Sequence, residues 1–127
     1  TGIDWITMQG HTNQKNLPKL ISRSDIFIFA SSCENMPNTL VEGMAIGMPI
    51  VCSDRGPMPE ILEDGGLYFD PEDEVSISES IEKIITDREI REEVSARAKV
   101  LSQQYSWDKC SDATFSNLIK TLKHSNM

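Results

Sequence analysis

Two short runs of consecutive apolar residues constrain the fold more than any other feature of this sequence. They are IFIFA at residues 26–30 and PIVC at residues 49–52. A continuous apolar run is typical of a parallel strand that helices cover on both faces. Between the two runs, LVEGMAI has the pattern of a helix that Asn38 or Thr39 caps and Gly47 ends. Strands that alternate with helices predict a Rossmann-like parallel α/β sheet with right-handed crossovers.

The remaining pattern completes this α/β arrangement. We expect two further strands, Trp5–Gln9 before Gly10 and LYF at residues 67–69, which makes four. A short helix runs from Pro59 to the Gly65-Gly66 pair. Apolar residues share a helical face in four further groups, which are Leu17, Leu20 and Ile21; Ile77, Ile81, Ile84 and Ile85; Ile90, Val94, Ala98 and Leu101; and Phe115, Leu118, Ile119 and Leu122. The 127 residues thus form a single domain, with a sheet-forming part with the site loops at 1–72 and a helical part at 73–127.

The charge of the chain is acidic and unevenly distributed. Twelve basic and 20 acidic residues give a net charge of −8. Residues 60–93 contain 13 acids and 3 bases, a net −10, and the remainder contains 7 acids and 9 bases, a net +2. We interpret the acidic stretch as the solvent-exposed side of helices, and we expect any anion site outside it. The acidic total also argues against binding nucleic acid, which requires clustered Lys and Arg.

Three cysteines and the hydropathy pattern bear on location. Cys33, Cys52 and Cys110 are an odd number without a CxxC pair, so neither a disulfide framework nor a structural zinc site is indicated. No apolar run approaches the ~20 residues of a membrane helix, and the start of the chain lacks the layout of a signal peptide. We therefore expect a cytoplasmic protein.

The segment SSCENMPNTLVEGMAIGMPIV carries the strongest functional signal. Ligands of open parallel sheets bind beyond the carboxyl ends of the strands, where this segment begins. Glu34 follows the IFIFA strand, and Glu42 lies eight residues later inside the next helix. Between them the backbone N–H groups of Asn38, Thr39 and Leu40 lack helical partners, so a diphosphate fits there. A carboxylate at Glu42 can accept hydrogen bonds from two vicinal ribose hydroxyls.

The order of the motifs resembles one enzyme family. The E-x7-E spacing in ENMPNTLVEGMAIGMPIVCSD is similar to the donor-binding signature of the retaining GT-B glycosyltransferases of family four. The strand, Gly10 and SRSDIFIFASS precede it, and GPMPEILEDGGLYFDPED and YSWDKC follow it in the family's order. The resemblance covers nearly the whole chain and implies the C-terminal, donor-binding domain of such an enzyme.

The resemblance also implies roles for individual residues. Glu34 would be catalytic, lying beside the donor sugar and supporting the transferred centre, and Glu42 would hold the ribose. The diphosphate would meet the loop and helix start, which contain Met36, Pro37, Asn38, Thr39 and Leu40. His11 and Thr12 would border the nucleobase. The substrate would be a nucleoside-diphosphate sugar, with no cofactor and no metal, and the sugar would pass to a glycan, lipid or small acceptor.

The chain departs from the full pattern of the family at its start. The basic pair that usually faces the diphosphate comes from an earlier strand and loop that this sequence does not contain. The N-terminal acceptor domain is also absent, and any contact with a membrane surface would occur through it. We therefore expect a truncated domain, from a sheet of about six strands, that is inactive alone.

Two alternative functions share the architecture. A sugar-nucleotide epimerase binds similar donors, but its sequence is expected to lack the GMPIV run joined to E-x7-E. A non-catalytic flavodoxin-like interaction domain is the other, although a receiver would need paired acids after its first strand, where this chain has Gln9-Gly10.

Three further residues receive interpretations of their own. Gly43 is predicted to permit close packing of its helix on a strand, and Trp107 to anchor the last helix against the sheet. Arg55 either reaches a phosphate or completes a turn.

Overall fold

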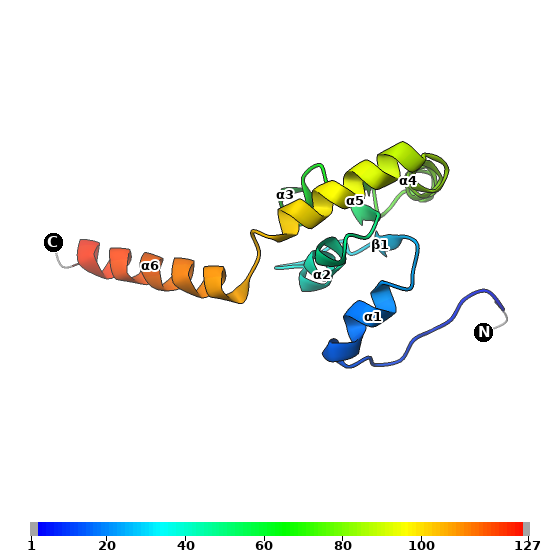
Figure 1. Ribbon diagram of the computed structural model, residues 1–127. Helices are drawn as coiled ribbons and strands as arrows, with labels where there is room; N and C mark the ends of the chain where they lie inside the picture. The colour runs from blue at the N-terminus through cyan, green and yellow to red at the C-terminus, as the bar shows by residue number, and fades with distance from the viewer. Residues whose placement is uncertain (1–2, 126–127) are drawn as a thin grey trace.

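The computed structural model describes residues 3–125 and contains one three-stranded parallel sheet with helices on both faces (Figure 1). The strands β1 (Phe27–Phe29), β2 (Ile50–Ser53) and β3 (Leu67–Phe69) follow one another in the order β1-β2-β3. The helical elements are η1 (Gln14–Asn16), α1 (Leu17–Ile21), α2 (Asn38–Ile46), α3 (Met58–Leu62), α4 (Glu74–Thr86), α5 (Arg88–Ser102) and α6 (Trp107–Ser125). The predicted α/β class is confirmed.

The central strand β2 divides the core into two layers. Ile50 and Cys52 pack with α2, α3 and the C-terminal half of α5, whereas Val51 packs on the other face with Phe69, Ile84 and Val94. All four residues of β2 are buried. The side chains of a strand point alternately to its two faces. Because helices cover both faces of β2, its positions favour apolar residues, which explains the continuous apolar run PIVC.

Helix α2 is held against the sheet by a glycine. A Cβ added at Gly43 would lie 3.1 Å from the Cδ1 atom of Phe27 in β1, so a larger residue would have to displace the Phe27 ring and glycine lets the helix approach this closely. Gly47 then ends the helix with φ = 83°, a left-handed conformation that glycine adopts without strain. The interpretations of both glycines are confirmed.

The predicted strand Trp5–Gln9 is wrong for this structure. The described part of that segment is irregular, and the side chains of Trp5 and Met8 are more than four-fifths exposed. In the described structure this segment pairs with no strand. The strand β1, at the edge where it would be expected to add, bonds only to β2. A strand without a neighbour leaves its backbone hydrogen bonds to water and gains no packing.

Strand β1 differs from the expectation that both of its faces are covered. It lies at one edge of the three-stranded sheet, and its central residue Ile28 is 48% exposed. Phe27 and Phe29 stack on each other at 6.3 Å between ring centroids and are only partly buried. The IFIFA run is therefore an edge strand here, and the interior strand is β2.

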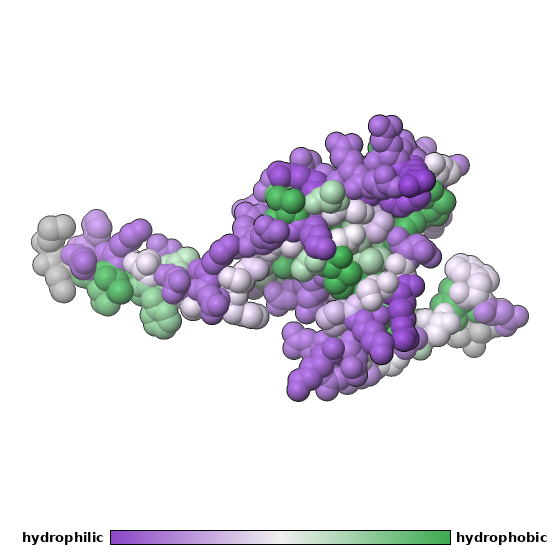
Figure 2. Space-filling model, viewed as in Figure 1, coloured by the Kyte–Doolittle hydropathy of each residue, from purple (hydrophilic) through white to green (hydrophobic). Residues whose placement is uncertain are grey.

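Helix α6 extends away from the sheet (Figure 1). Its predicted apolar stripe of Phe115, Leu118, Ile119 and Leu122 exists, and each of these side chains is more than half exposed. Figure 2 shows hydrophobic residues gathered along one side of this helix. The prediction that Trp107 anchors α6 on the sheet is wrong, because Trp107 is 81% exposed.

Candidate functional site

The loops that follow β1 and β2 meet at the carboxyl ends of these parallel strands. The loop after β1 contains Glu34, and the loop after β2 contains Gly56. A Cβ added at Gly56 would lie 3.9 Å from the backbone oxygen of Glu34, and Gly56 has φ = 55°. The two loops therefore touch, as adjacent parallel strands require.

The first turn of α2 presents a free backbone donor beside these loops. The N-cap residue Pro37 is buried and provides no side-chain cap. The predicted cap at Asn38 or Thr39 is therefore wrong, because the helix begins at Asn38 itself. The N–H of Asn38 donates to the carbonyl of Met36 at 2.9 Å, whereas no hydrogen bond within residues 3–125 engages the N–H groups of Thr39 and Leu40. Leu40 is fully buried, so its N–H group is not accessible to a ligand, and of the three predicted donors the N–H of the exposed Thr39 is the one free to meet an anion.

The two glutamates differ from the other partly buried acids of the chain. Asp70 accepts a hydrogen bond from Arg55 at 2.7 Å, and Asp87 accepts one from the N–H of Ile90 at 3.0 Å. Glu34 and Glu42 are also partly buried, yet within the described chain neither side chain has a hydrogen bond or an ion pair. No buried carboxylate oxygen among the described residues lacks a partner, so Glu34 and Glu42 keep contact with solvent and can accept hydrogen bonds from a ligand.

An open groove of about 740 Å³ runs between α2 and the start of α6. We call it the α2–α6 groove, and its lining combines α2, η1, the turn after α5 and α6. The lining residues are Gln14, Met36, Asn38, Val41, Glu42, Gln104, Tyr105, Ser106, Trp107, Lys109, Cys110 and Ala113. Its volume lies within the ~300–1,000 Å³ typical of small-ligand sites.

The groove brings together only part of the predicted site. Met36, Asn38 and Glu42 line it. Glu34 lies in the loop just before Met36 but does not line the groove, and Thr39 is exposed beside it. Pro37 and Leu40 are fully buried, so they position the helix start through packing and their backbone.

The predicted base contacts lie elsewhere. His11 is exposed, and Thr12 donates its hydroxyl to the carbonyl of Gly10 at 3.3 Å. Neither residue lines the groove, although nearby Gln14 does.

Helix α6 contributes groove residues that the sequence analysis did not assign to the site. Trp107 and Cys110, in the first turn of α6, line the groove. Lys109 carries the one positive charge among the lining residues that the structure describes, and its Nζ atom also donates to the carbonyl of Gln103 at 2.6 Å. The YSWDKC motif marked this segment, but nothing in the sequence shows that it returns to α2.

Arg55 is occupied by carboxylates. Its guanidinium lies 2.7 Å from Asp70 and 3.3 Å from Asp54, and 4.0 Å from Glu72. These contacts join the loop after β2 to the loop after β3. The structure therefore supports the structural interpretation of Arg55 over a phosphate contact.

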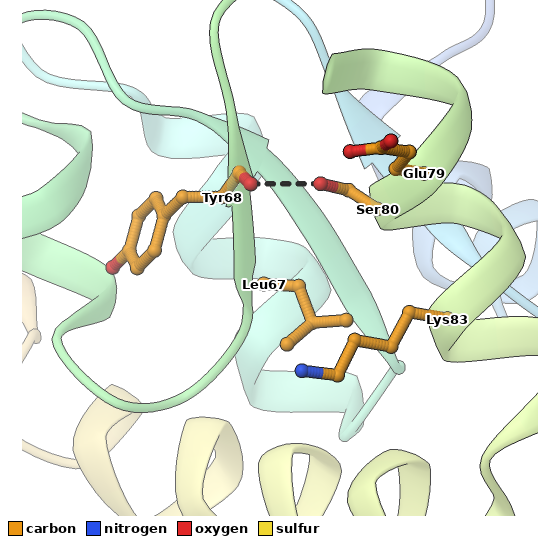
Figure 3. A pocket seen from close by; sticks show the side chains of 5 residues that line it. All are labelled: Leu67, Tyr68, Glu79, Ser80 and Lys83. Carbon is orange, nitrogen blue, oxygen red and sulfur yellow. Dashed lines mark hydrogen bonds between the residues drawn. The ribbon is translucent and has the colours of Figure 1, made fainter. Parts of the chain in front are cut away.

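A smaller cavity of about 230 Å³ lies between β3 and α4 (Figure 3). Leu67, Tyr68, Glu79, Ser80 and Lys83 line it, and the Ser80 hydroxyl donates to the backbone carbonyl of Tyr68 at 2.8 Å. This hydrogen bond satisfies a backbone carbonyl of the edge strand β3, so we interpret the residues around the cavity as structural.

The described residues contain neither a metal-binding cluster nor a membrane span. Between residues 3 and 125, no three His, Cys, Asp or Glu side chains are grouped so that they could hold a metal ion. The helices of that same range include none with the length and apolar character of a membrane span.

Known proteins share both the sequence and the fold of this chain. Residues 2–101 match the family described as "Glycosyl transferases group 1". The chain is 34% identical over 110 residues to O-antigen chain mannosyltransferase B of Escherichia coli, which covers 87% of this chain and 29% of that protein. It is 26% identical to a sulfoquinovosyl transferase of Arabidopsis thaliana over 106 residues, or 80% of this chain and 20% of the relative.

The fold agrees with a solved GT-B structure. Sucrose-phosphate synthase from Thermosynechococcus elongatus superimposes with a TM-score of 0.81 at 21% identity, over 96% of this chain and 31% of that one. The chain spans less than a third of each of these proteins. The expected GT-B architecture is confirmed, and the transferase interpretation holds over the epimerase and the interaction domain. The chain belongs to the glycosyl transferases group 1 family.

Proposed function

We propose that this chain binds the nucleoside-diphosphate sugar donor of a retaining glycosyltransferase, which passes the sugar to a glycan, lipid or small acceptor. The observation that carries the proposal is the pair of carboxylates of Glu34 and Glu42, unpartnered within residues 3–125, on either side of the exposed and free N–H group of Thr39 at the start of α2. Carboxylates recognise hydroxyl groups and N–H groups recognise phosphates, and a sugar nucleotide offers both.

Each part of the donor has a matching group on the chain. The diphosphate meets the positive end of α2, where the helix dipole favours an anion without a metal ion. The ribose hydroxyls donate to Glu42 inside the groove. The sugar lies toward Glu34, whose negative charge stabilises the positive charge that develops at the anomeric carbon when the bond to the diphosphate breaks.

The relatives support transfer as the reaction. The two named curated relatives are a mannosyltransferase and a sulfoquinovosyl transferase, and both transfer sugars by name. Because this chain covers less than a third of each, we propose that an acceptor domain and further cationic groups come from polypeptide outside it. We expect donor binding by this chain alone and no turnover. A reducing cytoplasm is the compartment we propose, since Cys33, Cys52 and Cys110 are all free.

Calorimetric titration of the chain with UDP, GDP and ADP tests the proposal. We expect one of the three to bind without added metal, and we expect Glu42→Ala to weaken that binding about tenfold or more, because a hydrogen bond to a charged group contributes about 1.5–3 kcal/mol. Glu82→Ala is the matched control, since Glu82 is exposed on α4 and far from the groove lining. Absence of binding by all three at millimolar concentration, in a sample shown to be folded, would contradict the proposal.

A further inference from the structure

The loop that carries Glu34 joins the helix that carries Glu42 at a buried proline. Pro37 is fully buried and is the N-cap residue of α2. Its carbonyl accepts a hydrogen bond of the first helical turn, from the N–H of Val41 at 3.2 Å. The direction in which the loop leaves the helix is therefore set by the backbone angles of this residue.

Pro37 is the central residue of an inverse γ-turn. Its backbone angles are φ = −78° and ψ = 76°, and the N–H of Asn38 donates to the carbonyl of Met36 at 2.9 Å, as this turn requires. The proline ring holds φ near ~−65°, so the turn is favoured before any ligand binds. Within residues 3–125 this is the one hydrogen bond that the backbone of residues 34–36 makes, so the ring of Pro37 is an important restraint on the joint.

The parts on either side of the joint are held by separate contacts. Gly56, in the loop after β2, lies against the backbone of Glu34, since a Cβ added there would be 3.9 Å from the Glu34 oxygen. On the other side, α2 packs closely on Phe27 of β1 through Gly43. Pro37 thus links two anchored segments, each with one of the two glutamates.

We infer that Pro37 is a positioning residue that holds Glu34 in register with Glu42, so that one sugar nucleotide contacts both. The inference rests on the proposed function and names what sets the geometry of that site. In the proposed arrangement the diphosphate and ribose bind to α2, which follows Pro37, and the sugar lies toward Glu34, which precedes it. A rigid joint lets the ligand make both sets of contacts without first ordering the loop.

Calorimetry with two ligands tests this role, because only one of them spans the joint. UDP, GDP or ADP, whichever binds, contacts α2 alone, whereas the matching UDP-glucose, GDP-mannose or ADP-glucose also reaches Glu34. We expect the sugar nucleotide to bind more tightly than the nucleoside diphosphate in the unchanged chain. Pro37→Ala should weaken the sugar nucleotide about two- to fivefold, and Pro37→Gly about tenfold, since each step adds backbone freedom. The affinity for the nucleoside diphosphate should stay within about twofold in both variants.

Pro49 provides the matched control. It is half-buried and precedes β2, at the end of that strand opposite to the loop with Gly56. Pro49→Ala and Pro49→Gly add comparable backbone freedom away from the glutamates, and they should change the affinity for neither ligand. Circular dichroism checks that all four variants are folded.

The outcomes separate the inference from the proposed function. Equal losses for the two ligands in Pro37→Gly overturn the inference, because a general disturbance of α2 would produce them. An unchanged affinity for the sugar nucleotide in Pro37→Gly also overturns it, and so does a sugar nucleotide that binds the unchanged chain no more tightly than the nucleoside diphosphate. In these three cases the proposed function stands if Glu42→Ala weakens nucleotide binding. If the unchanged chain binds none of the nucleotides, both fail together.

Discussion

Replacing Gly65 with alanine should destabilise the fold through one close backbone approach. Gly65 is buried in the turn between α3 and β3, and its N–H donates to the carbonyl of Leu62 at 2.7 Å. A Cβ added at Gly65 would lie 2.9 Å from the Cα atom of Ala98 and 2.9 Å from the oxygen of Leu62. Both are backbone atoms, so no side-chain rotation relieves the overlap, and α5 must move away from the turn.

Overpacking of this kind costs about 1–3 kcal/mol. Alanine also restricts the unfolded chain, which offsets roughly 0.4–1 kcal/mol. We therefore expect the free energy of unfolding to fall by about 1–2 kcal/mol, which moves the urea midpoint by about 1 M for a chain of this size.

Urea unfolding followed by circular dichroism measures this shift. Gly10→Ala is the matched control, since nothing lies within 4 Å of a Cβ added there, and we expect its midpoint to stay equal or rise slightly. Equal midpoints for Gly65→Ala and Gly10→Ala would refute the close contact between the α3–β3 turn and α5.

Three further predictions concern single side chains. Arg55→Gln should lower the free energy of unfolding by about 1 kcal/mol or less, because Arg55 and its partner Asp70 are about 40% exposed, and it should leave nucleotide binding unchanged in calorimetry. Burial raises the pKa of Cys52 from 9.0 to about 12, so the stability contributed by its protonated thiol is complete below pH 9 and is lost as the pH rises toward 12. Alkaline unfolding should accordingly be less steep with pH in Cys52→Ala. Lys109→Gln should weaken binding of nucleoside diphosphates in calorimetry by several-fold and leave binding of the uncharged nucleosides unchanged, since only the phosphates carry charge.

Much of the fold follows from local sequence patterns. The interior strand β2 is found because both of its faces are buried, and the end of α2 because Gly47 adopts a left-handed conformation. The failed strand at Trp5–Gln9 shows the limit of such patterns. A strand exists only with a neighbour to bond to, and the residues themselves do not reveal whether that neighbour is present.

The same contrast between local patterns and distant contacts applies to the candidate site. Glu34 and Glu42 were predicted as site residues because they lie near the end of one strand and in the next helix, where local spacing is informative. Trp107 and Lys109 were not assigned to the groove, because they reach it from more than 60 residues farther along the chain, through the turn after α5. Contacts between distant segments depend on tertiary packing, which no local period encodes.

The most direct test of donor binding compares the ribose hydroxyls with Glu42 in a double-mutant cycle. The preferred nucleoside diphosphate and its 2′,3′-dideoxy analogue are titrated into the unchanged chain and into Glu42→Ala. The proposed site predicts that removing the hydroxyls weakens binding about tenfold or more in the unchanged chain and has little further effect in Glu42→Ala, because both changes remove the same hydrogen bonds. Equal losses in both proteins would contradict the placement of the ribose on Glu42.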